Sequence, residues 1–137
     1  MPKLKKKIVL SPAEADKPRL KLNLRVFYGE NIAMGPGKAA LLEAIVSTGS
    51  ISAAGRSMDM SYRRAWSLVD EMNRCFKSPL VEAAKGGAHG GGAHLTEFGQ
   101  EVLKRYRTME GSAKQVASAY VNLFDGLMAD HPPVPAE

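Results

Sequence analysis

The most constraining feature of this sequence is a run of small residues between two short segments that both have helical spacing. Ala53, Ala54 and Gly55 follow Ser50, and a second helical segment begins at Ser61. Serine directly before such a segment is typical of a helix N-cap. Small side chains allow two helices to approach closely across a sharp turn. The sequence therefore predicts a helix-turn-helix, with one helix over residues 51–58 and the next from Ser61 to about Phe76.

The second of these helices has distinct inward and outward faces. Its expected inward stripe is Ala65, Val69, Met72 and Phe76, at the spacing of an amphipathic helix. The residues left at the exposed start of the helix are Ser61, Tyr62, Arg63, Arg64 and Ser67. For the rings of Tyr62 and Trp66, packing in the core and hinge is favoured over an exposed stacking platform.

A glycine-rich hairpin is expected after the helix-turn-helix. Residues 79–83 and 93–95 are short, apolar and alternating, and the loop between them contains five glycines. Such a loop cannot pack a core, so it forms the tip of a wing. Thr96 then has the position of an N-cap for a long helix that runs to about Met128.

The residues before the helix-turn-helix predict a small β component. Leu20 to Tyr28 alternate as a half-buried strand does, and Ile32 to Met34 form the expected return strand. A helix over 38–48 follows, ended by Gly49. The expected fold is thus mainly α with a small β component: a winged helix-turn-helix domain with an N-terminal β-hairpin and a long C-terminal helix. The expected organisation is a flexible basic arm over 1–18, the winged domain over 19–96, a dimerisation helix over 97–129 and a disordered tail over 130–137.

The long helix carries apolar residues at close to coiled-coil spacing. Its first half, Phe98 to Tyr106, is expected to pack on its own domain. Its second half has no partner left in so short a chain, which favours a homodimer. The residues expected at the dimer interface are Tyr106, Met109, Ala113, Val116, Tyr120, Leu123 and Leu127.

Composition and charge narrow the functional classes. The 137 residues carry a net charge of +5, and residues 1–28 contain eight basic and two acidic residues, which suits a nucleic acid or a solvated tail. Cys75 is the single cysteine, so an internal disulfide is excluded and an intracellular setting is expected. The apolar runs are far shorter than the roughly 20 residues of a membrane span. We expect a cytoplasmic protein without membrane contact.

The exposed start of the second helix suits the major groove of double-stranded DNA. Arginine can pair bidentately with guanine, serine can bond phosphate or base edges, and a helix N-terminus attracts phosphate. The wing can lie on the neighbouring backbone or minor groove. The candidate DNA-binding residues are Ser50, Ser52, Ser61, Tyr62, Arg63, Arg64, Ser67, Lys85, Gly86, Gly87 and His89.

Two other functional classes compete with DNA binding. Helix-turn-helix geometry also occurs in protein-interaction modules, so the winged helix could instead dock on a separate ligand-sensing partner. An enzyme has no support, because His89, His94, His131 and Cys75 lack the spacing of a metal site or a nucleophilic triad. We therefore expect no catalytic residues and no metal.

The same residues resemble a known family. Gly49 to Ala54, Met60 to Trp66, Val69 to Asn73 and the glycine-rich loop into Leu95 to Gly99 are similar to the N-terminal domain of the ModE family of molybdate-responsive transcriptional regulators. The LysR-type winged helix shares the outline but not this wing. The resemblance spans about residues 20–128. It implies a dimeric winged helix-turn-helix that binds operator DNA of molybdenum-uptake and molybdoenzyme genes, usually as a repressor.

The resemblance does not extend to the sensing part of that family. ModE proteins that sense molybdate do so through C-terminal Mop-type domains, and these have no counterpart in the 137 residues. We therefore expect no cofactor in this chain, and a separate molybdate-sensing partner if molybdate is sensed.

Overall fold

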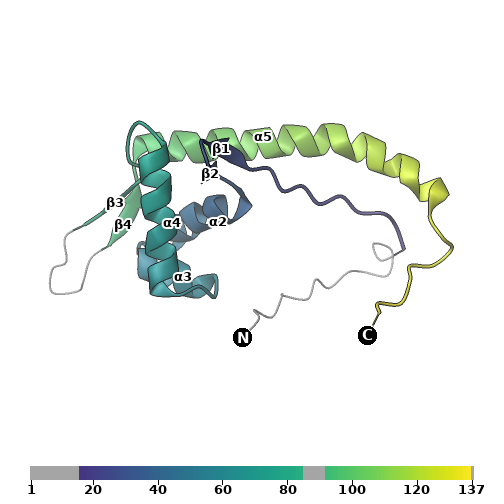
Figure 1. Ribbon diagram of the computed structural model, residues 1–137, viewed down its shortest axis with the longest axis horizontal. Helices are drawn as coiled ribbons and strands as arrows, with labels where there is room; N and C mark the ends of the chain where they lie inside the picture. The colour runs from purple at the N-terminus through teal and green to yellow at the C-terminus, as the bar shows by residue number, and fades with distance from the viewer. Residues whose placement is uncertain (1–15, 85–91, 137) are drawn as a thin grey trace. The chain divides into compact units, whose positions relative to one another are not determined.

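The computed structural model describes residues 16–84 and 92–136. It divides into two units. The larger comprises residues 23–111, and the smaller contains the other described residues, 16–22 and 112–136. The larger unit is a mainly α winged helix-turn-helix, as the sequence predicts (Figure 1). Of the predicted basic arm, residues 1–15 lie outside the described residues.

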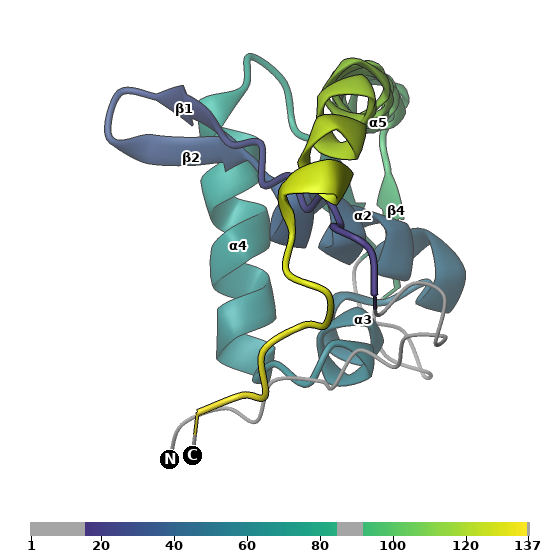
Figure 2. The same ribbon diagram turned by 90° about the vertical axis from the view of Figure 1, so that its right-hand side faces the viewer.

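The larger unit begins with an antiparallel hairpin of β1 (Val26–Tyr28) and β2 (Asn31–Met34), in which Val26 pairs with Met34. The predicted strand from Leu20 was too long, because the short return strand ends at Met34 and leaves no partner for the residues before Val26. β2 packs against α4 (Tyr62–Cys75), and Figure 2 shows the hairpin beside the C-terminal end of that helix.

The first helices end within one residue of the predicted positions, but the predicted start of the first one at residue 38 was wrong: it begins at Pro36, because proline suits the first turn of a helix. α2 (Pro36–Thr48) starts with proline in its first turn and ends at Gly49, which has a left-handed φ of 75° and donates its N–H to the Ile45 carbonyl over 2.7 Å. α3 (Ile51–Ser57) is capped by the Ser50 hydroxyl, which accepts the Ala53 N–H over 2.9 Å. These contacts satisfy backbone groups that helix ends leave unpaired.

The wing is confirmed in its two strands, β3 (Val81–Ala83) and β4 (Ala93–Leu95). They pair antiparallel, with Val81 opposite Leu95. The Thr96 hydroxyl donates to the Pro79 carbonyl over 2.7 Å and accepts the Gly99 N–H over 2.8 Å, which joins the base of the wing to the next helix. The tip of the wing, residues 85–91, lies outside the described residues.

One core joins the helices of the larger unit. Its fully buried side chains are contributed by β2, α2, α4 and the start of the wing: Met34, Leu41, Leu42, Ile45, Met72 and Leu80. Burying each such side chain stabilises the fold by about 1.5–3 kcal/mol. The predicted stripe of α4 is confirmed for Ala65, Val69 and Met72, all buried. Phe76 lies at its margin, in edge-to-face contact with Phe98 at 6.3 Å between ring centroids.

The last helix, α5 (Glu97–Val121), begins against the wing. A Cβ atom on Gly99 would lie 2.8 Å from the Leu80 carbonyl carbon and closer still to its oxygen, so only glycine fits at this contact. Arg107 holds α5 to α2 by a bond of 3.2 Å from its Nε to Glu43 Oε2. The helix was predicted to run to about Met128, but the residues Asn122–Leu127 tighten into a 3-10 helix, η1. None of the helices over 16–84 and 92–136 has the length and hydropathy to cross a membrane.

Candidate nucleic-acid interface

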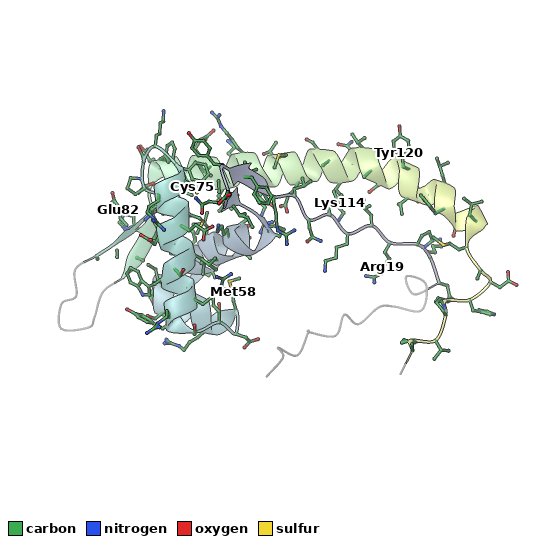
Figure 3. All side chains as sticks on the ribbon, in the orientation of Figure 1. Arg19, Met58, Cys75, Glu82, Lys114 and Tyr120 are labelled. Carbon is green, nitrogen blue, oxygen red and sulfur yellow. The ribbon has the colours of Figure 1, made fainter. Side chains whose placement is uncertain are left out.

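The turn between α3 and α4 depends on very close packing of the two helices. A Cβ atom on Gly55 would lie 2.9 Å from the Cβ of Ala65. The Gly55 carbonyl accepts the N–H of Met60 over 2.9 Å, and Asp59 adopts a left-handed φ of 56°. Aspartate tolerates this conformation better than most residues. The turn, marked by Met58 in Figure 3, therefore fixes where α4 begins.

The structure places the predicted residues of α4 on its open side. Ser61, Tyr62, Arg63, Arg64 and Ser67 are all exposed, and the buried residues of the helix lie on the opposite side. In Figure 1 the N-terminal end of α4 is its lower end, with the wing strands on the left and α2 on the right. The exposed start of α4 thus lies at the end away from the β1–β2 hairpin.

The arginines at the start of α4 lie outside the ion pairs of the described residues, although the charge of Arg64 helps to lower the pKa of Glu71. Arg63 and Arg64 form no ion pair there, whereas Arg74, further along the helix, pairs with Asp70 over 3.1 Å. Two positive charges therefore stand at the start of the helix beside its positive dipole end, which favours an anionic ligand.

The serines at the starts of α3 and α4 cap these helices through their hydroxyl oxygens, and each hydroxyl hydrogen stays free to donate. Ser61 Oγ accepts the N–H of Arg64 over 3.0 Å, as Ser50 Oγ accepts that of Ala53. Each hydroxyl uses its oxygen in the cap and retains a hydrogen to donate, so capping does not exclude a phosphate contact. Ser52 is half-buried on α3.

The aromatic residues of α4 depart from prediction. Tyr62 is 62% exposed and Trp66 is 37% exposed, so the expectation of core and hinge packing was wrong. The rings contact each other, with 6.0 Å between centroids and an angle of 58° between planes. The reason is helical phase: both lie on the flank of α4 beside the buried stripe rather than within it.

An ion pair that the sequence analysis missed holds α4 against α2. The Lys38 ammonium is buried, lies 2.8 Å from Glu71 Oε1 and donates to the Ile32 carbonyl as well. The bond from Lys38 keeps the pKa of Glu71 below its usual value, against the effect of burial. A sequence signal existed, because Lys38 stands three and four residues before Leu41 and Leu42 and so on the buried face of α2.

A second missed contact ties α4 to the wing. Asn73 Oδ1 accepts the N–H groups of Leu80 over 2.9 Å and of Val81 over 3.2 Å, and its Nδ2 donates to the Val81 carbonyl over 3.2 Å. A single amide thus sets the position of β3 relative to α4. No local pattern indicates this role, because the bonds depend on how the chain returns after the helix.

The predicted contacts in the wing tip fall outside the described residues: Lys85, Gly86, Gly87 and His89. The wing strands present Glu82 and His94 outward, with 3.6 Å between His94 Nε2 and Glu82 Oε2.

The residues of the predicted dimerisation stripe are buried at its start and exposed further along the chain. Tyr106, assigned to it from the sequence, is only 3% exposed, and its hydroxyl donates to the Leu24 carbonyl over 2.8 Å. Burial raises its pKa to about 12. Tyr106 therefore belongs to the core of its own unit, which corrects that assignment. Further along, Val116, Tyr120, Leu123 and Leu127 are between 63% and 79% exposed.

A separate pocket lies at the other end of the larger unit. It has a volume of about 550 Å³ and is lined mostly by apolar side chains of β1, β2, the end of α4 and α5, including Phe76, Phe98 and Met109. On the β1 strand that contributes Val26 to this pocket, Phe27 and Tyr28 are 60% and 71% exposed. Among the described residues, no three histidine, cysteine, aspartate or glutamate side chains gather closely enough to hold a metal ion.

Comparison with known proteins supports the helix-turn-helix. The family model described as "Bacterial regulatory helix-turn-helix protein, lysR family" matches residues 38–100, which contain most of α2, all of α3 and α4, and the wing strands. The chain is 44% identical over 87 residues to the molybdenum-pterin-binding protein MopB of Rhodobacter capsulatus, covering 64% of this chain and 32% of that protein.

Other relatives are named as transcriptional regulators. The chain is 41% identical over 87 residues to the transcriptional regulator ModE of Yersinia pestis, covering 64% of this chain and 31% of the relative. It is 42% identical over 71 residues to the DNA-binding transcriptional dual regulator ModE of Escherichia coli (strain K12), covering 52% of this chain and 27% of the relative. The chain thus spans about a third of the length of the curated relatives it matches.

The capped turn, the exposed helix and the wing agree with these comparisons, and the predicted resemblance is confirmed. Residues 38–100 of this chain match the lysR-type helix-turn-helix model, and the chain resembles the ModE regulators over more than half of its length.

Proposed function

We propose that this protein is a dimeric, sequence-specific DNA-binding transcriptional regulator. The observation that carries the proposal is the exposed start of α4, where Arg63 and Arg64 lie outside the ion pairs of the described residues. Recognition helices of helix-turn-helix proteins contact base edges through their N-terminal residues. The names of the ModE relatives support the same class of function.

The proposed contacts divide by chemistry. Arg63 and Arg64 pair with guanine edges, Ser67 contacts a base edge or phosphate, and the hydroxyls of Ser50, Ser52 and Ser61 donate to phosphates. Lys85, Gly86, Gly87 and His89 of the wing contact the neighbouring backbone. Their role is proposed from the sequence alone.

The proposed dimer forms through a stripe that runs along α5 from Met109 through the half-buried Ala113 and the exposed Val116 to Tyr120 and continues in η1 with Leu123 and Leu127. Apolar side chains with this spacing and exposure are typical of a helix that packs against another. A dimer presents two recognition helices to two half-sites. The protein then acts in the cytoplasm, where it reaches DNA.

We further propose that the regulated genes serve molybdenum uptake or molybdoenzymes and that the protein represses them. The support is the names of the relatives, which include molybdenum-pterin-binding protein and molybdenum transport protein. A transcriptional reporter fused to the selected site tests the sign of regulation.

The test of DNA binding begins with duplexes selected from a random pool by the purified chain. Replacing Arg63 and Arg64 together by alanine should lower affinity for the selected duplex by about 100-fold or more, because each good bidentate contact contributes about 1–3 kcal/mol. The matched control replaces exposed Lys104 and Arg105 of α5 by alanine, which removes the same net charge elsewhere. Equal affinity of the two variants would overturn the assignment of α4, and an equal loss on all sequences would reduce both arginines to phosphate contacts.

The second candidate function is docking on a separate, molybdate-sensing protein. The pocket lined by Phe76, Phe98 and Met109, together with the exposed hairpin residues Phe27 and Tyr28, favours it. The two candidates separate cleanly: enrichment of one sequence from the pool supports DNA recognition, and no enrichment supports docking. Molybdate and sulfate, titrated against DNA binding at fixed ionic strength, then show whether the isolated chain responds to the oxyanion itself.

A further inference from the structure

The structure leaves two aromatic rings on the helix that is proposed to enter DNA. Tyr62 is the first residue of α4 and is 62% exposed, and Trp66, one turn later, is 37% exposed. Their ring centroids lie 6.0 Å apart. Exposed aromatic rings at adjoining turns form a continuous apolar surface, whose burial against a partner is favourable.

The position of this pair on α4 follows from helical geometry. Residues 62, 66 and 73 are separated by four and seven positions, so they lie on one flank of the helix. Asn73 bonds Leu80 and Val81 at the base of the wing. The aromatic pair therefore lies on the flank of α4 from which the wing starts, and Figure 3 shows Glu82 of β3 on that side of the helix.

The arginines occupy different directions from the rings. Arg63 and Ser67 are four residues apart and point outward, opposite the buried Ala65 and Val69. Tyr62 is adjacent to Arg63 but rotated by about 100° around the helix axis. A helix lying in the major groove thus offers donors along its centre and an apolar surface along one edge.

The major groove displays one apolar group, the C5-methyl of thymine. An exposed ring beside arginine donors is chemically suited to cover that methyl, whereas it has no hydrogen-bond acceptor for cytosine beyond the tyrosine hydroxyl. The Trp66 ring contacts the Tyr62 ring from the next turn.

We propose that Tyr62, supported by Trp66, selects thymine on the wing side of the recognition helix by packing against its C5-methyl group. The inference rests on the proposed DNA-binding function and adds a class of base to it: sites should combine guanine read by arginine with thymine read by the aromatic pair.

The test uses the full chain and the duplex that it selects from a random pool. Each thymine is replaced in turn by deoxyuridine, which removes only the methyl group and retains base pairing. Replacement at the contacted position should weaken binding about fourfold, the effect of leaving one methyl-sized apolar group unburied. Fluorescence anisotropy measures both affinities at one salt concentration.

Variants assign the effect to the ring. Tyr62→Ala should bind the thymine and uracil duplexes equally, while Tyr62→Phe should keep the fourfold preference because the ring remains. Tyr28→Ala is the matched control: Tyr28 is 71% exposed on β1, outside the helix-turn-helix, and its loss should leave the preference unchanged. Because Tyr62 is exposed, its replacement does not remove core packing.

The possible results are distinguishable. If no duplex is enriched, the proposed DNA-binding function fails. If a duplex is enriched but deoxyuridine is tolerated at every thymine, the function stands and thymine selection is overturned. If Tyr62→Ala weakens both duplexes equally and the fourfold preference persists, the ring contacts the sugar–phosphate backbone instead, and the inference is again overturned.

Discussion

Helices α4 and α5 are both amphipathic, but the apolar stripe of α4 is buried whereas that of α5 is buried only in part. The stripe of α4 is covered by its own unit from Ala65 to Met72. The stripe of α5 is covered at Tyr106, which is 3% exposed, and is open at Val116, which is 65% exposed. Regular apolar spacing therefore shows which face of a helix is to be buried but not which partner buries it.

The buried and exposed faces of these two helices have different proposed roles. Because α4 is fixed on its inward side by packing, by the Lys38–Glu71 pair and by Asn73, its outward side is free to carry arginines. In α5 the fixed part is the first half, where Gly99 and Arg107 hold it to the larger unit. We propose that the remaining stripe packs against a second copy.

The largest effect is expected when the exposed part of the α5 stripe is removed. Truncation after Ser112 should abolish or greatly weaken the dimer and lower DNA affinity by about 100-fold, because two linked recognition helices gain strongly from avidity. Sedimentation and anisotropy measure the two effects. An unchanged dimer in the truncated protein would place the interface elsewhere.

Substitutions in the full chain separate the stripe from the rest of the helix. Val116→Ser with Tyr120→Ser should act as the truncation does, because both residues lie on the open stripe. Gln115→Ala with Ser118→Ala is the matched control and should leave the dimer intact, since these positions face away from Val116 on the helix.

The covered part of α5 is tested at Gly99. Gly99→Ala should lower the free energy of unfolding by about 3 kcal/mol, because the added Cβ meets the Leu80 carbonyl and the backbone must shift. Chemical denaturation monitored by circular dichroism gives the value. A loss below about 1 kcal/mol would mean that α5 is not held closely to the base of the wing.

The ion pair that holds α4 against α2 is tested by replacing Glu71. Glu71→Gln should destabilise the protein by about 2 kcal/mol at neutral pH, because the buried Lys38 loses its counter-charge. The bond from Lys38 lowers the pKa of Glu71 from its usual value of 4.5. Its contribution is therefore complete above that value and is lost as pH falls through the lower, folded-state pKa.

Thermal unfolding from about pH 7 to about pH 3 checks this dependence. The difference between the wild type and Glu71→Gln should shrink toward low pH, while exposed Glu30→Gln serves as the control and should change little throughout. A difference that stays constant with pH would mean that the ion pair does not stabilise the fold.

The smallest expected effect has the opposite sign and comes from α5. Gly111→Ala should raise the free energy of unfolding by about 1 kcal/mol, because alanine is the better helix former and its Cβ would meet no atom within 4 Å. Residue 111 lies opposite Met109 on the helix, away from the stripe. The same denaturation experiment is done on Gly99→Ala, which should be destabilised where Gly111→Ala is stabilised. A destabilised Gly111→Ala would contradict the open surroundings of residue 111.

Features that depend on neighbours along the chain were predictable from the sequence. Helix starts at Ser50 and Ser61, the end of α2 at Gly49 and the exposed arginines of α4 were all predictable, because capping and helical periodicity are local. The helix-turn-helix and the wing strands followed from the same signals.

Contacts between segments that are distant in the sequence became visible only in the folded structure. Strand β1 was shortened by the length of its partner, Tyr106 was taken into the core by the chain near Leu24, and Trp66 was left partly exposed by its phase on α4. The Lys38–Glu71 pair joins residues 33 positions apart. These outcomes depend on contacts between segments distant in the sequence, and burial energy is set by those contacts rather than by the periodicity of any one segment.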